Sequence, residues 1–413
     1  MAGVTEELLG RFKALQLVCD SMSFPAVLRC SSVAVESSYG MRLAEDIEAP
    51  ESYPPFSRSL RDGYAVRSVD VKGASISSPV FLRKCGIIPM GKVIQESLPK
   101  EAAMQILTGG ILPPGSDAVV MVEDTEEIGP WIEVRKGVMP GENVIIQGEE
   151  IKSGNIIARA GDLLDFKNIP AAVGLGVREV KVVDLKIGIL STGDEIVEAG
   201  ANCVPPGCVR DVNSTTLRLL LKFYGYDAQF LGIVHDDLQV LTSAVQDALR
   251  KNDVVILSGG SSVSTRDYCS EVIKNLGDPG LIVRGINMRP GKPTLIGGIK
   301  GETTKLVVSL PGHPLSCAVV AKAVLLPLLD MMIGGINLYE RNFVPTVMKC
   351  LDDVVGKSGV EEYVPVLSEP GGVVPVNSKS GYISALIGTI GLGMLPVNKE
   401  TLRVGEEIEV ILW

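Results

Sequence analysis

The sequence predicts a multidomain α/β plus β protein, and three observations support this prediction. The chain has 413 residues, which is too long for one compact core. Its middle third alternates apolar runs with amphipathic helical patterns, which is typical of a parallel sheet with helical crossovers. The segments on either side carry short strand patterns separated by glycine and proline turns, which favours smaller β domains.

The N-terminal part begins with a helical pattern and then becomes rich in strands. Residues 5–19 have the pattern of a capped amphipathic helix, with Leu8, Phe12, Leu15 and Val18 on one face. Strand patterns follow, and the clearest of them cover residues 77–82, 102–107, 118–123 and 131–134. The segment 141–161 then looks like a return to the β unit begun at 28–48.

The middle third predicts a regular alternation of strands and helices. The expected strands are 185–191, 228–234, 254–258 and 306–310, and the expected helices are 213–224, 238–250, 266–276 and 314–332. Gly225 and Gly277 are expected to end two of these helices. Because ligands bind at the carboxyl ends of parallel strands, the turns after Ser191, Ser258 and Leu310 should share one ligand-binding edge.

These patterns, together with the family resemblance given at the end of this section, imply four expected domains, two of them discontinuous. The expected bounds are 22–50 and 148–182 for a linking β domain, 51–147 for a β-rich domain, 1–21 and 183–335 for the α/β domain, and 336–413 for a C-terminal β domain.

Composition excludes several classes of protein. The net charge is −10 and no lysine- or arginine-rich block occurs, which argues against bulk nucleic-acid binding. No signal peptide pattern is visible, and the longest apolar stretch, 318–332, contains Lys322, Pro327 and Asp330 and therefore predicts a buried helix and not a membrane span. Eight scattered cysteines with only two histidines favour free thiols over a zinc site, and a cytoplasmic location is expected.

Three turns that expose the backbone predict an anion site in the α/β domain. Gly259 and Gly260 directly follow an apolar strand and precede Ser261 and Ser262, so bare amides can approach a phosphate closely. The other two turns are Arg289-Pro290-Gly291-Lys292-Pro293 and Leu310-Pro311-Gly312-His313-Pro314. Arg289 and Lys292 on a rigid turn would suit an oxyanion, whereas a solvated lysine and a histidine without an acid–base role are the plainer alternatives.

Acidic residues beside these turns predict a divalent cation. Ser191, Thr192 and Gly193 can contact phosphate oxygens, but Asp194 and Glu195 would repel them unless Mg²⁺ lies between. The alternative for Asp194 is a helix cap.

The remaining acids of the middle third raise the same choice between a structural and a functional role. One of Asp236 and Asp237 should cap the next helix, leaving the other as a ligand candidate. Asp267 is either a metal or substrate contact or a residue that stabilises the helix dipole. Asn213 or Ser214 is expected to cap a helix, which leaves Asp211 the harder residue to explain.

Short motifs along nearly the whole chain resemble the MoeA family, which includes the E domains of gephyrin and Cnx. In order they are Arg42-Leu43-Ala44-Glu45-Asp46-Ile47, Pro54-Pro55-Phe56, Asp62-Gly63-Tyr64-Ala65-Val66, Thr108-Gly109-Gly110, Asp117-Ala118-Val119-Val120, Gly148-Glu149-Glu150-Ile151, Ser191-Thr192-Gly193-Asp194-Glu195, Gly259-Gly260, Pro290-Gly291-Lys292-Pro293, Leu310-Pro311-Gly312, Ser380-Gly381 and Leu395-Pro396. Each motif is short, but the ordered set is specific.

The resemblance implies molybdopterin molybdotransferase activity, in which Mg²⁺ supports insertion of molybdate into adenylylated molybdopterin with release of AMP. It also implies an elongated homodimer with a MogA-like α/β molybdopterin-binding domain, a β-rich lid domain, a small linking domain and a C-terminal β-barrel-like domain. The active cleft would lie between the α/β domain of one subunit and the domain around Asp62 and Thr108 of the other. A MogA-like adenylyltransferase would be a natural partner.

Motif matching carries the family's roles to individual positions of this chain. The catalytic roles fall on Asp62, Thr108, Glu195, Asp267 and Lys292. The metal-binding roles fall on Glu195, Asp236, Asp237 and Asp267. Together with the turns described above, the substrate-binding roles fall on Ser191, Thr192, Gly193, Asp194, Gly259, Gly260, Ser261, Ser262, Arg289, Pro290, Gly291, Pro293, Pro311, Gly312 and His313.

Five positions depart from the family pattern. Ser261 and Ser264 replace a valine and a glycine, Glu150 replaces an aspartate, His313 stands where asparagine is usual, and Val360 where arginine is usual. These changes favour an alternative, a non-catalytic or tungstate-specific paralogue that acts as a molybdopterin-binding carrier or scaffold. The intact Asp62, Asp267 and Pro290–Pro293 turn favour the enzyme. An adenylyltransferase is a third reading, although that activity resembles the α/β domain alone.

Overall fold

The computed structural model describes residues 8–26, 28–259, 268–301 and 303–413, which form two compact units. The first unit combines the chain up to Glu45 with Ala160–Asp165 and Val180–Trp413. The second unit combines Asp46–Arg159 with Phe166–Glu179. The four-domain division expected from the sequence is finer than these two units and stays a prediction.

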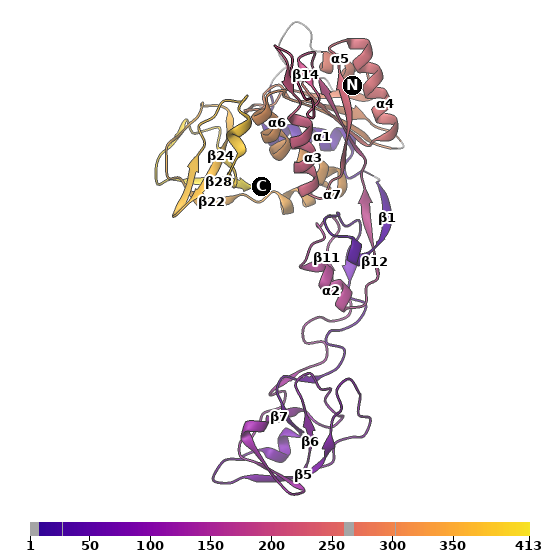
Figure 1. Ribbon diagram of the computed structural model, residues 1–413, viewed down its shortest axis with the longest axis vertical. Coiled ribbons are helices and arrows are strands. Elements are labelled where there is room, and N and C mark those ends of the chain that lie inside the picture. Colours follow the sequence, from indigo (N-terminus) through magenta and orange to yellow (C-terminus); the bar gives the residue numbers. More distant parts are fainter. Residues whose placement is uncertain (1–7, 27, 260–267, 302) are drawn as a thin grey trace. The chain divides into compact units, whose positions relative to one another are not determined.

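A six-stranded sheet forms the centre of the first unit (Figure 1). Its strands, in spatial order, are β16 (Ala228–Val234), β13 (Ile187–Thr192), β17 (Val254–Ser258), β21 (Lys305–Leu310), β20 (Leu295–Ile299) and β18 (Pro279–Arg284). The first four are parallel, as predicted, and lie within two residues of their expected bounds. The last two are antiparallel, which the sequence did not indicate.

Glycines interrupt the apolar pattern of these two strands, with Gly297 and Gly298 in β20 and Gly280 in β18. A Cβ on Gly297 would lie 2.2 Å from the carbonyl oxygen of Gly280, and one on Gly298 would lie 2.1 Å from that of Lys305. These glycines therefore allow close packing of neighbouring backbones. In the sequence they look like turn residues.

Helices cover both faces of this sheet, so its strands are apolar on both sides. One face packs against α1 (Arg11–Met22), α3 (Asn213–Phe223) and the helical segment that begins with α6 (Pro314–Val320). The other face packs against α4 (Leu238–Lys251) and α5 (Tyr268–Lys274). The predicted helix end at Gly225, which has φ of 79°, is confirmed, whereas α5 ends at Lys274, before Gly277 is reached. Residues 266 and 267, the expected start of α5, lie outside the described residues.

The helix predicted at 314–332 is buried and longer than expected. After α6 it continues through a π-helical turn (Ala321–Leu325) into α7 (Leu326–Asn342), which is kinked at Gly335. Within the described residues, 314–342 is the one helical segment long and apolar enough to cross a membrane, and 89% of its most apolar window is buried in the protein. Its burial against the sheet fits a core helix, as the sequence predicted.

The N-terminal helix presents a different face from the one predicted. Leu15 and Val18 are buried, but Leu8 and Phe12 remain exposed. Arg11 points inward instead, because its guanidinium donates to Glu361 Oε1 (3.2 Å) and to the Tyr339 hydroxyl (3.3 Å). The capping residue predicted at Thr5 lies outside the described residues, and Gly10 precedes the first turn without a side-chain cap.

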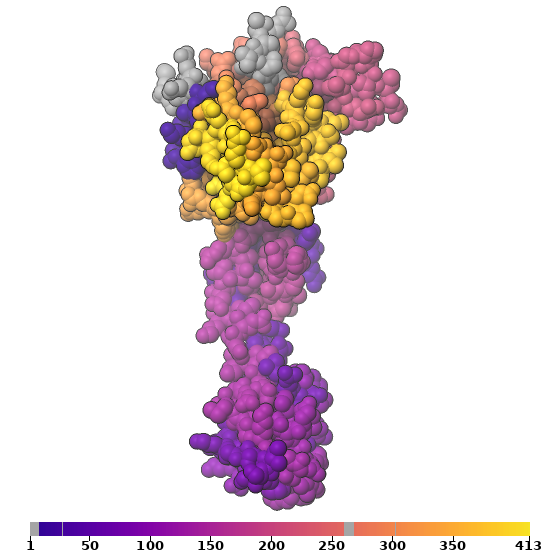
Figure 2. Space-filling view, turned by 90° about the vertical axis from the view of Figure 1, so that its left-hand side faces the viewer, coloured from indigo at the N-terminus to yellow at the C-terminus, as the bar shows by residue number. Residues whose placement is uncertain are grey.

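The C-terminal part of the first unit is a second sheet. Its strands, in spatial order, are β19 (Met288–Arg289), β24 (Glu361–Glu369), β26 (Gly391–Leu395), β28 (Glu407–Leu412) and β22 (Thr346–Lys349), with β25 (Gly372–Pro375) on β24. Because β19 follows β18 in the chain, this pairing joins the C-terminal sheet to the α/β region. The C-terminal residues are yellow in Figure 2.

The second unit contains a separate six-stranded sheet. Its strands, in spatial order, are β7 (Ala118–Met121), β4 (Gly63–Val66), β6 (Ala102–Ile106), β5 (Val80–Ile87), β9 (Trp131–Val134) and β8 (Thr125–Ile128). The strands predicted from 102, 118 and 131 are confirmed, whereas the one predicted at 77–82 begins three residues later and is longer.

Short elements complete the two units. They are β1 (Arg29–Ala34) with β12 (Glu179–Asp184), β2 (Ile47–Glu48) with β11 (Ile156–Ala158), β3 (Arg58–Ser59) with β10 (Val144–Ile145), β14 (Ile196–Val197) with β15 (Val209–Arg210), β23 (Val354–Val355) with β27 (Thr401–Leu402), and the helix α2 (Asn168–Gly174).

A buried polar cluster lies beneath the helices of the first unit. Asp330 accepts hydrogen bonds from the Tyr226 hydroxyl (2.7 Å) and from Asn342 Nδ2 (3.0 Å), and it lies 3.7 Å from Arg42 Nη2. Lys322 donates to the Tyr224 hydroxyl nearby. Burial lowers the pKa of Lys322 from 10.5 to about 8, although Asp330 partly offsets this effect. Keeping the Lys322 ammonium group charged in this buried position therefore costs free energy.

Lys322→Met should remove a pH dependence of folding. The folded pKa lies below the unfolded one, so the unfolded chain binds more protons between about pH 8 and 10.5, and the free energy of unfolding of the wild type rises with pH there. We expect the difference in free energy of unfolding between the wild type and Lys322→Met to change by on the order of 3 kcal/mol between about pH 7 and pH 10. Urea unfolding at a series of pH values measures this, with the exposed Lys222→Met as the control; a parallel pair of curves for wild type and Lys322→Met would contradict it.

Candidate functional site

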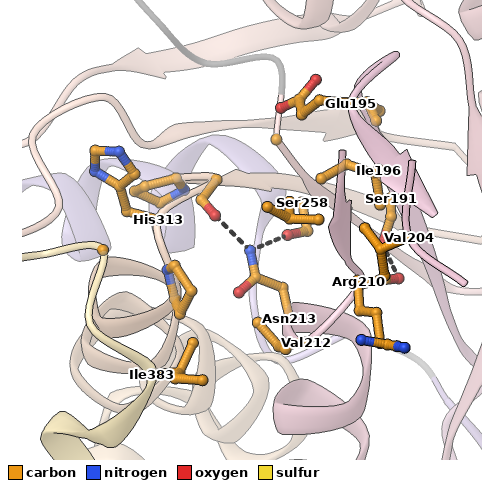
Figure 3. Close-up of a pocket in the computed structure, with 18 of the residues that line it drawn as sticks. Ser191, Glu195, Ile196, Val204, Arg210, Val212, Asn213, Ser258, His313 and Ile383 are labelled. Carbon is orange, nitrogen blue, oxygen red and sulfur yellow. Dashed lines mark hydrogen bonds between the residues drawn. The ribbon is translucent and has the colours of Figure 1, made fainter. Parts of the chain in front are cut away.

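Three strand ends of the central sheet meet at one edge and open into one cavity. Ser191 pairs with Ser258, and Ser258 pairs with Leu310, so the three turns predicted to share an edge do so in register. The cavity has a volume of about 890 Å³ (Figure 3). The sequence-predicted residues that line it are Ser191, Thr192, Glu195, Gly259, Pro293, Pro311, Gly312 and His313.

Two glycines bring bare backbone to the cavity wall. Gly259 has φ of 112°, and a Cβ there would lie 2.2 Å from the carbonyl oxygen of Thr192. A Cβ on Gly312 would lie 3.5 Å from the Cα of Gly259, so the two glycine turns approach each other closely. This geometry requires glycine at 259, whose N–H donates to the Leu310 carbonyl oxygen (3.3 Å), and the neighbouring Gly312 is the exposed glycine of the two. Gly260, Ser261, Ser262 and Asp267 lie outside the described residues, so their predicted roles stay predictions.

A buried hydrogen-bond network supports the cavity floor. Asp211 is 4% exposed and accepts from Ser191 Oγ (2.6 Å) and from the backbone N–H of Ser214 (3.0 Å). Asn213 Nδ2 donates to Ser258 Oγ (2.9 Å) and to the Gly312 carbonyl oxygen (2.8 Å). The sequence expectation that Asn213 or Ser214 caps α3 is therefore wrong, because Asp211 holds the first turn and Asn213 ties two strand ends together.

Two polar atoms on this wall are buried without a partner among the described residues. They are Thr192 Oγ1 and Asn213 Oδ1, on side chains whose residues are 2% and 8% exposed. An unpaired buried polar atom costs roughly 1–3 kcal/mol, so natural proteins rarely keep one without a ligand or water. Both atoms are therefore candidates for contact with a polar ligand.

An acidic cluster borders the cavity. Asp194 Oδ1 contacts His235 Nδ1 (3.0 Å) and accepts from the Asp236 N–H (3.3 Å); the pKa of Asp194 is lowered, mainly by the His235 contact. Reduced hydration raises the pKa of Asp236, and the charges of Asp194 and Glu195 raise it further. Asp194 begins no helix, since β14 follows it, so the cap alternative is wrong.

The choice between the two adjacent acids, Asp236 and Asp237, is settled in part. Asp237 Oδ1 accepts from the N–H groups of Gln239 and Val240 (both 2.9 Å) and so caps α4. One of the pair was expected to do so, and this leaves Asp236 with its carboxylate available beside Asp194 and Glu195. Among the described residues, no group of three potential metal ligands stands close enough to form a site by itself.

The basic turn lies beside the cavity and contacts the C-terminal sheet. Pro293 lines the cavity, while Lys292 is exposed. Arg289 Nη1 lies 3.5 Å from Glu362 Oε1, so this guanidinium has a carboxylate partner. Gly291 has φ of 126°, and a Cβ there would lie 2.5 Å from Val320, which explains the glycine between Pro290 and Lys292. His313 Nδ1 contacts Ser380 Oγ at 2.9 Å.

Sequence reasoning gave no site role to several lining residues from the β14–β15 segment and the C-terminal part of the chain, which are Ile196, Val204, Val209, Arg210, Val212, Gly381 and Ile383. The cavity is also lined by Asn213, by Asp211, which the sequence had singled out, and by Ser258 and Pro314, which belong to the predicted ligand-edge turns. Apolar residues of a loop give no sequence signal for a binding site. Asn213 did stand out, but as a cap. None of the eight cysteines forms a disulfide in the part of the chain that the structure describes.

Asp62 and Thr108 form a local site within the second unit. Asp62 Oδ1 accepts from the Thr108 N–H (2.6 Å) and from its hydroxyl (2.8 Å). These hydrogen bonds, the backbone one first, hold the pKa of Asp62 below its usual value. Asp62 is thereby kept ionised and oriented by the Thr-Gly-Gly turn at Thr108.

Thr108→Val should raise the pKa of Asp62, because the variant removes one of the two hydrogen bonds that favour the carboxylate. Carbon-13 NMR titration of the aspartate carboxyl groups measures this. Thr125→Val is the matched control, since its hydroxyl donates to the Val122 carbonyl and touches no carboxylate. An Asp62 titration curve that is the same in Thr108→Val as in the wild type would contradict the assignment.

Comparison with known proteins identifies the family. Residues 12–176 match the MoeA N-terminal region (domain I and II), 188–331 a probable molybdopterin binding domain, and 347–413 the MoeA C-terminal region (domain IV). The putative molybdopterin biosynthesis protein MJ0666 of Methanocaldococcus jannaschii is 34% identical over 384 residues, covering 89% of this chain and 88% of that protein. The chain belongs to the MoeA family. The resemblance and multidomain fold expected from the sequence are thus confirmed.

Other MoeA relatives are similar over almost the full length. A molybdopterin molybdenumtransferase of Staphylococcus aureus is 29% identical over 403 residues, covering 96% of this chain and 93% of the relative. Crystal structures of molybdopterin biosynthesis MoeA proteins from Pyrococcus horikoshii match with TM-scores of 0.79 and 0.83, at 34% and 27% identity. Each match covers 98% of this chain, and 99% and 100% of the solved chains respectively.

Proposed function

We propose that this MoeA-family protein is a molybdopterin molybdotransferase, which inserts molybdate into adenylylated molybdopterin and releases AMP in molybdenum cofactor biosynthesis. The relatives named molybdopterin molybdenumtransferase support the reaction class. The observation that carries the proposal in this chain is the cavity at the sheet edge, which combines glycine backbone, unpaired buried polar atoms and a bordering acidic cluster.

Magnesium fits this proposal by the chemistry of the donor set. Asp236 carries a pKa raised in part by the charges of Asp194 and Glu195, so these carboxylates already repel one another and a cation would relieve that repulsion. Mg²⁺ prefers carboxylate, phosphate and water oxygens and is often held by only one or two protein carboxylates. Glu195 and Asp236 are the described residues that would hold it, with Asp267 as a further candidate. Bound Mg²⁺ would neutralise charge on the substrate phosphates.

The chain's own residues then bind and orient the substrate. The backbone of the exposed Gly312, which packs against Gly259, admits a phosphate group closely. Lys292 on its turn adds a positive charge for the anionic substrate. The Ser191 hydroxyl donates to Asp211 and so presents its oxygen as an acceptor, whereas the Ser258 hydroxyl accepts from Asn213 and keeps its hydrogen as a donor; both hydroxyls are therefore oriented before the substrate arrives.

Three further proposals follow from the family resemblance. The protein acts as a homodimer in which Asp62 and Thr108 of one subunit complete the active site of the other. It receives adenylylated molybdopterin from a MogA-like adenylyltransferase. It works in the cytoplasm.

In the test, the protein is mixed with adenylylated molybdopterin and Mg²⁺, and molybdate, tungstate or neither oxyanion is added. The release of AMP is then measured. We expect release that depends on both Mg²⁺ and molybdate. Tight binding of the adenylylated pterin without AMP release under any condition would refute the transferase and support the carrier, which the departure at Val360 favours. Release with tungstate alone would assign the protein to the tungstate-specific alternative.

A further inference from the structure

The orientation of Asn213 determines what its unpaired atom can accept. Its side-chain amide is 8% exposed and contacts the Gly312 carbonyl oxygen, which can only accept a hydrogen bond. The amide nitrogen must therefore face Gly312, and the amide oxygen must point elsewhere. Figure 3 shows the nitrogen toward Ser258 and the turn at Gly312, with the oxygen directed away from both. The unpaired group at this point of the wall is thus a buried, fixed hydrogen-bond acceptor.

A second buried polar atom lies on the same cavity wall. Thr192 is 2% exposed, and its Oγ1 has no partner in the part of the chain that the structure describes. A Cβ built on Gly259 would lie 2.9 Å from this oxygen, so Thr192 Oγ1 faces the glycine turn at the cavity. A hydroxyl can accept as well as donate.

We propose that Asn213 Oδ1 and Thr192 Oγ1 read the N–H edge of the pterin ring and so determine which end of the substrate enters this part of the cavity. The inference rests on the proposed function. Phosphate and molybdate oxygens are acceptors and cannot satisfy Asn213 Oδ1. A pterin offers an amino group and an adjacent ring N–H, which are two donors for two acceptors, whereas adenine offers one amino group.

The rest of the wall suits a flat ring. Ile196, Val209, Val212, Pro293 and Pro311 line the same cavity and can pack against an aromatic face. The pterin therefore lies over Asn213 and Thr192, and the phosphate end is left to the exposed turn at Gly312. Asn213 acts in this scheme as a specificity-determining residue and takes no part in bond making.

Thr192→Val gives the cleanest test, because it removes a hydroxyl that makes no hydrogen bond with the described residues. We expect affinity for adenylylated molybdopterin to fall roughly tenfold, the size of one neutral buried hydrogen bond, while affinity for AMP stays within about twofold. The thermal unfolding midpoint should not fall. The matched control is Thr242→Val, which removes a hydroxyl that donates to the Leu238 carbonyl oxygen. The thermal unfolding midpoint of this variant should fall, and its affinities for both ligands should not change.

Asn213→Ala provides the second arm. It removes the acceptor together with the ties to Ser258 and Gly312, so a purely structural role would weaken AMP and adenylylated molybdopterin by the same factor. We expect the pterin ligand to lose at least about fivefold more affinity than AMP.

Equilibrium binding to the full chain without molybdate keeps the two proposals separable. A wild type that binds adenylylated molybdopterin but never releases AMP would refute the transferase and leave this inference standing. Two outcomes would overturn the inference. Equal losses of affinity for AMP and for adenylylated molybdopterin in both variants would mean that the two atoms contact adenine or have a structural role. Unchanged affinity for adenylylated molybdopterin would mean that the two atoms bind only water.

Discussion

Glu195→Gln should reduce molybdate-dependent AMP release about a hundredfold, which corresponds to about 2.7 kcal/mol of activation free energy. Glu195 lines the cavity, and its carboxylate folds back over Gly193, where a Cβ would lie 2.7 Å from Oε2. Figure 3 shows it at the border of the cavity. The substitution keeps the shape but removes a charge that the proposed function uses to hold Mg²⁺, so the loss should appear in kcat and in the Mg²⁺ requirement. Steady-state kinetics over a Mg²⁺ series measures both.

Glu198→Gln is the control for that experiment. Glu198 is an exposed acid three residues further along the chain and lines neither the large cavity nor the smaller one beside it. Its replacement should leave AMP release within about twofold. If Glu195→Gln and Glu198→Gln behaved alike, Glu195 would be only a surface acid at the border of the cavity.

Asp330→Asn should destabilise the first unit by about 3 kcal/mol. The side chains of Asp330 and Arg42 are 9% and 7% exposed, and Lys322 lies in the same cluster. Removing the carboxylate charge leaves two buried cations without compensation, and this is the costly way to break a buried ion pair. Urea denaturation at neutral pH, followed by circular dichroism, gives the change in the free energy of unfolding.

The control for Asp330→Asn is a substitution in an exposed ion pair whose charged atoms lie closer together. Asp247 lies 2.7 Å from Arg250 on α4, with side chains 62% and 75% exposed. Asp247→Asn should cost less than about 1 kcal/mol, because water screens the pair. Equal effects of the two substitutions would show that burial of the Asp330 cluster contributes nothing to the stability of the protein.

The ligand-binding edge could be predicted from the sequence because it depends on local patterns. Apolar runs that end at Ser191, Ser258 and Leu310 give three parallel strands, and parallel strands bring their carboxyl ends to one edge. The glycine at 259 and the cap at Asp237 also follow from local chemistry. These features need no knowledge of distant contacts.

The remaining features depend on contacts between distant parts of the chain. Asn213 looks like a cap until Gly312, almost one hundred residues later, supplies a better partner for its amide. Arg11 occupies the inner face of α1 because Glu361 and Tyr339 lie there to receive it. The glycine-rich strand β20 resembles a loop until the carbonyl of Gly280 approaches it. Local propensity cannot anticipate such partners.

The most direct test of the central claim is a single-turnover measurement of molybdenum and AMP together. The full-length protein is loaded with adenylylated molybdopterin and Mg²⁺, molybdate is added, and the pterin-bound molybdenum and the released AMP are quantified. We predict equal amounts of both products, and neither product when molybdate is omitted. Release of AMP without incorporation of molybdenum, or an adenylylated pterin that stays bound and intact after molybdate is added, would contradict the account.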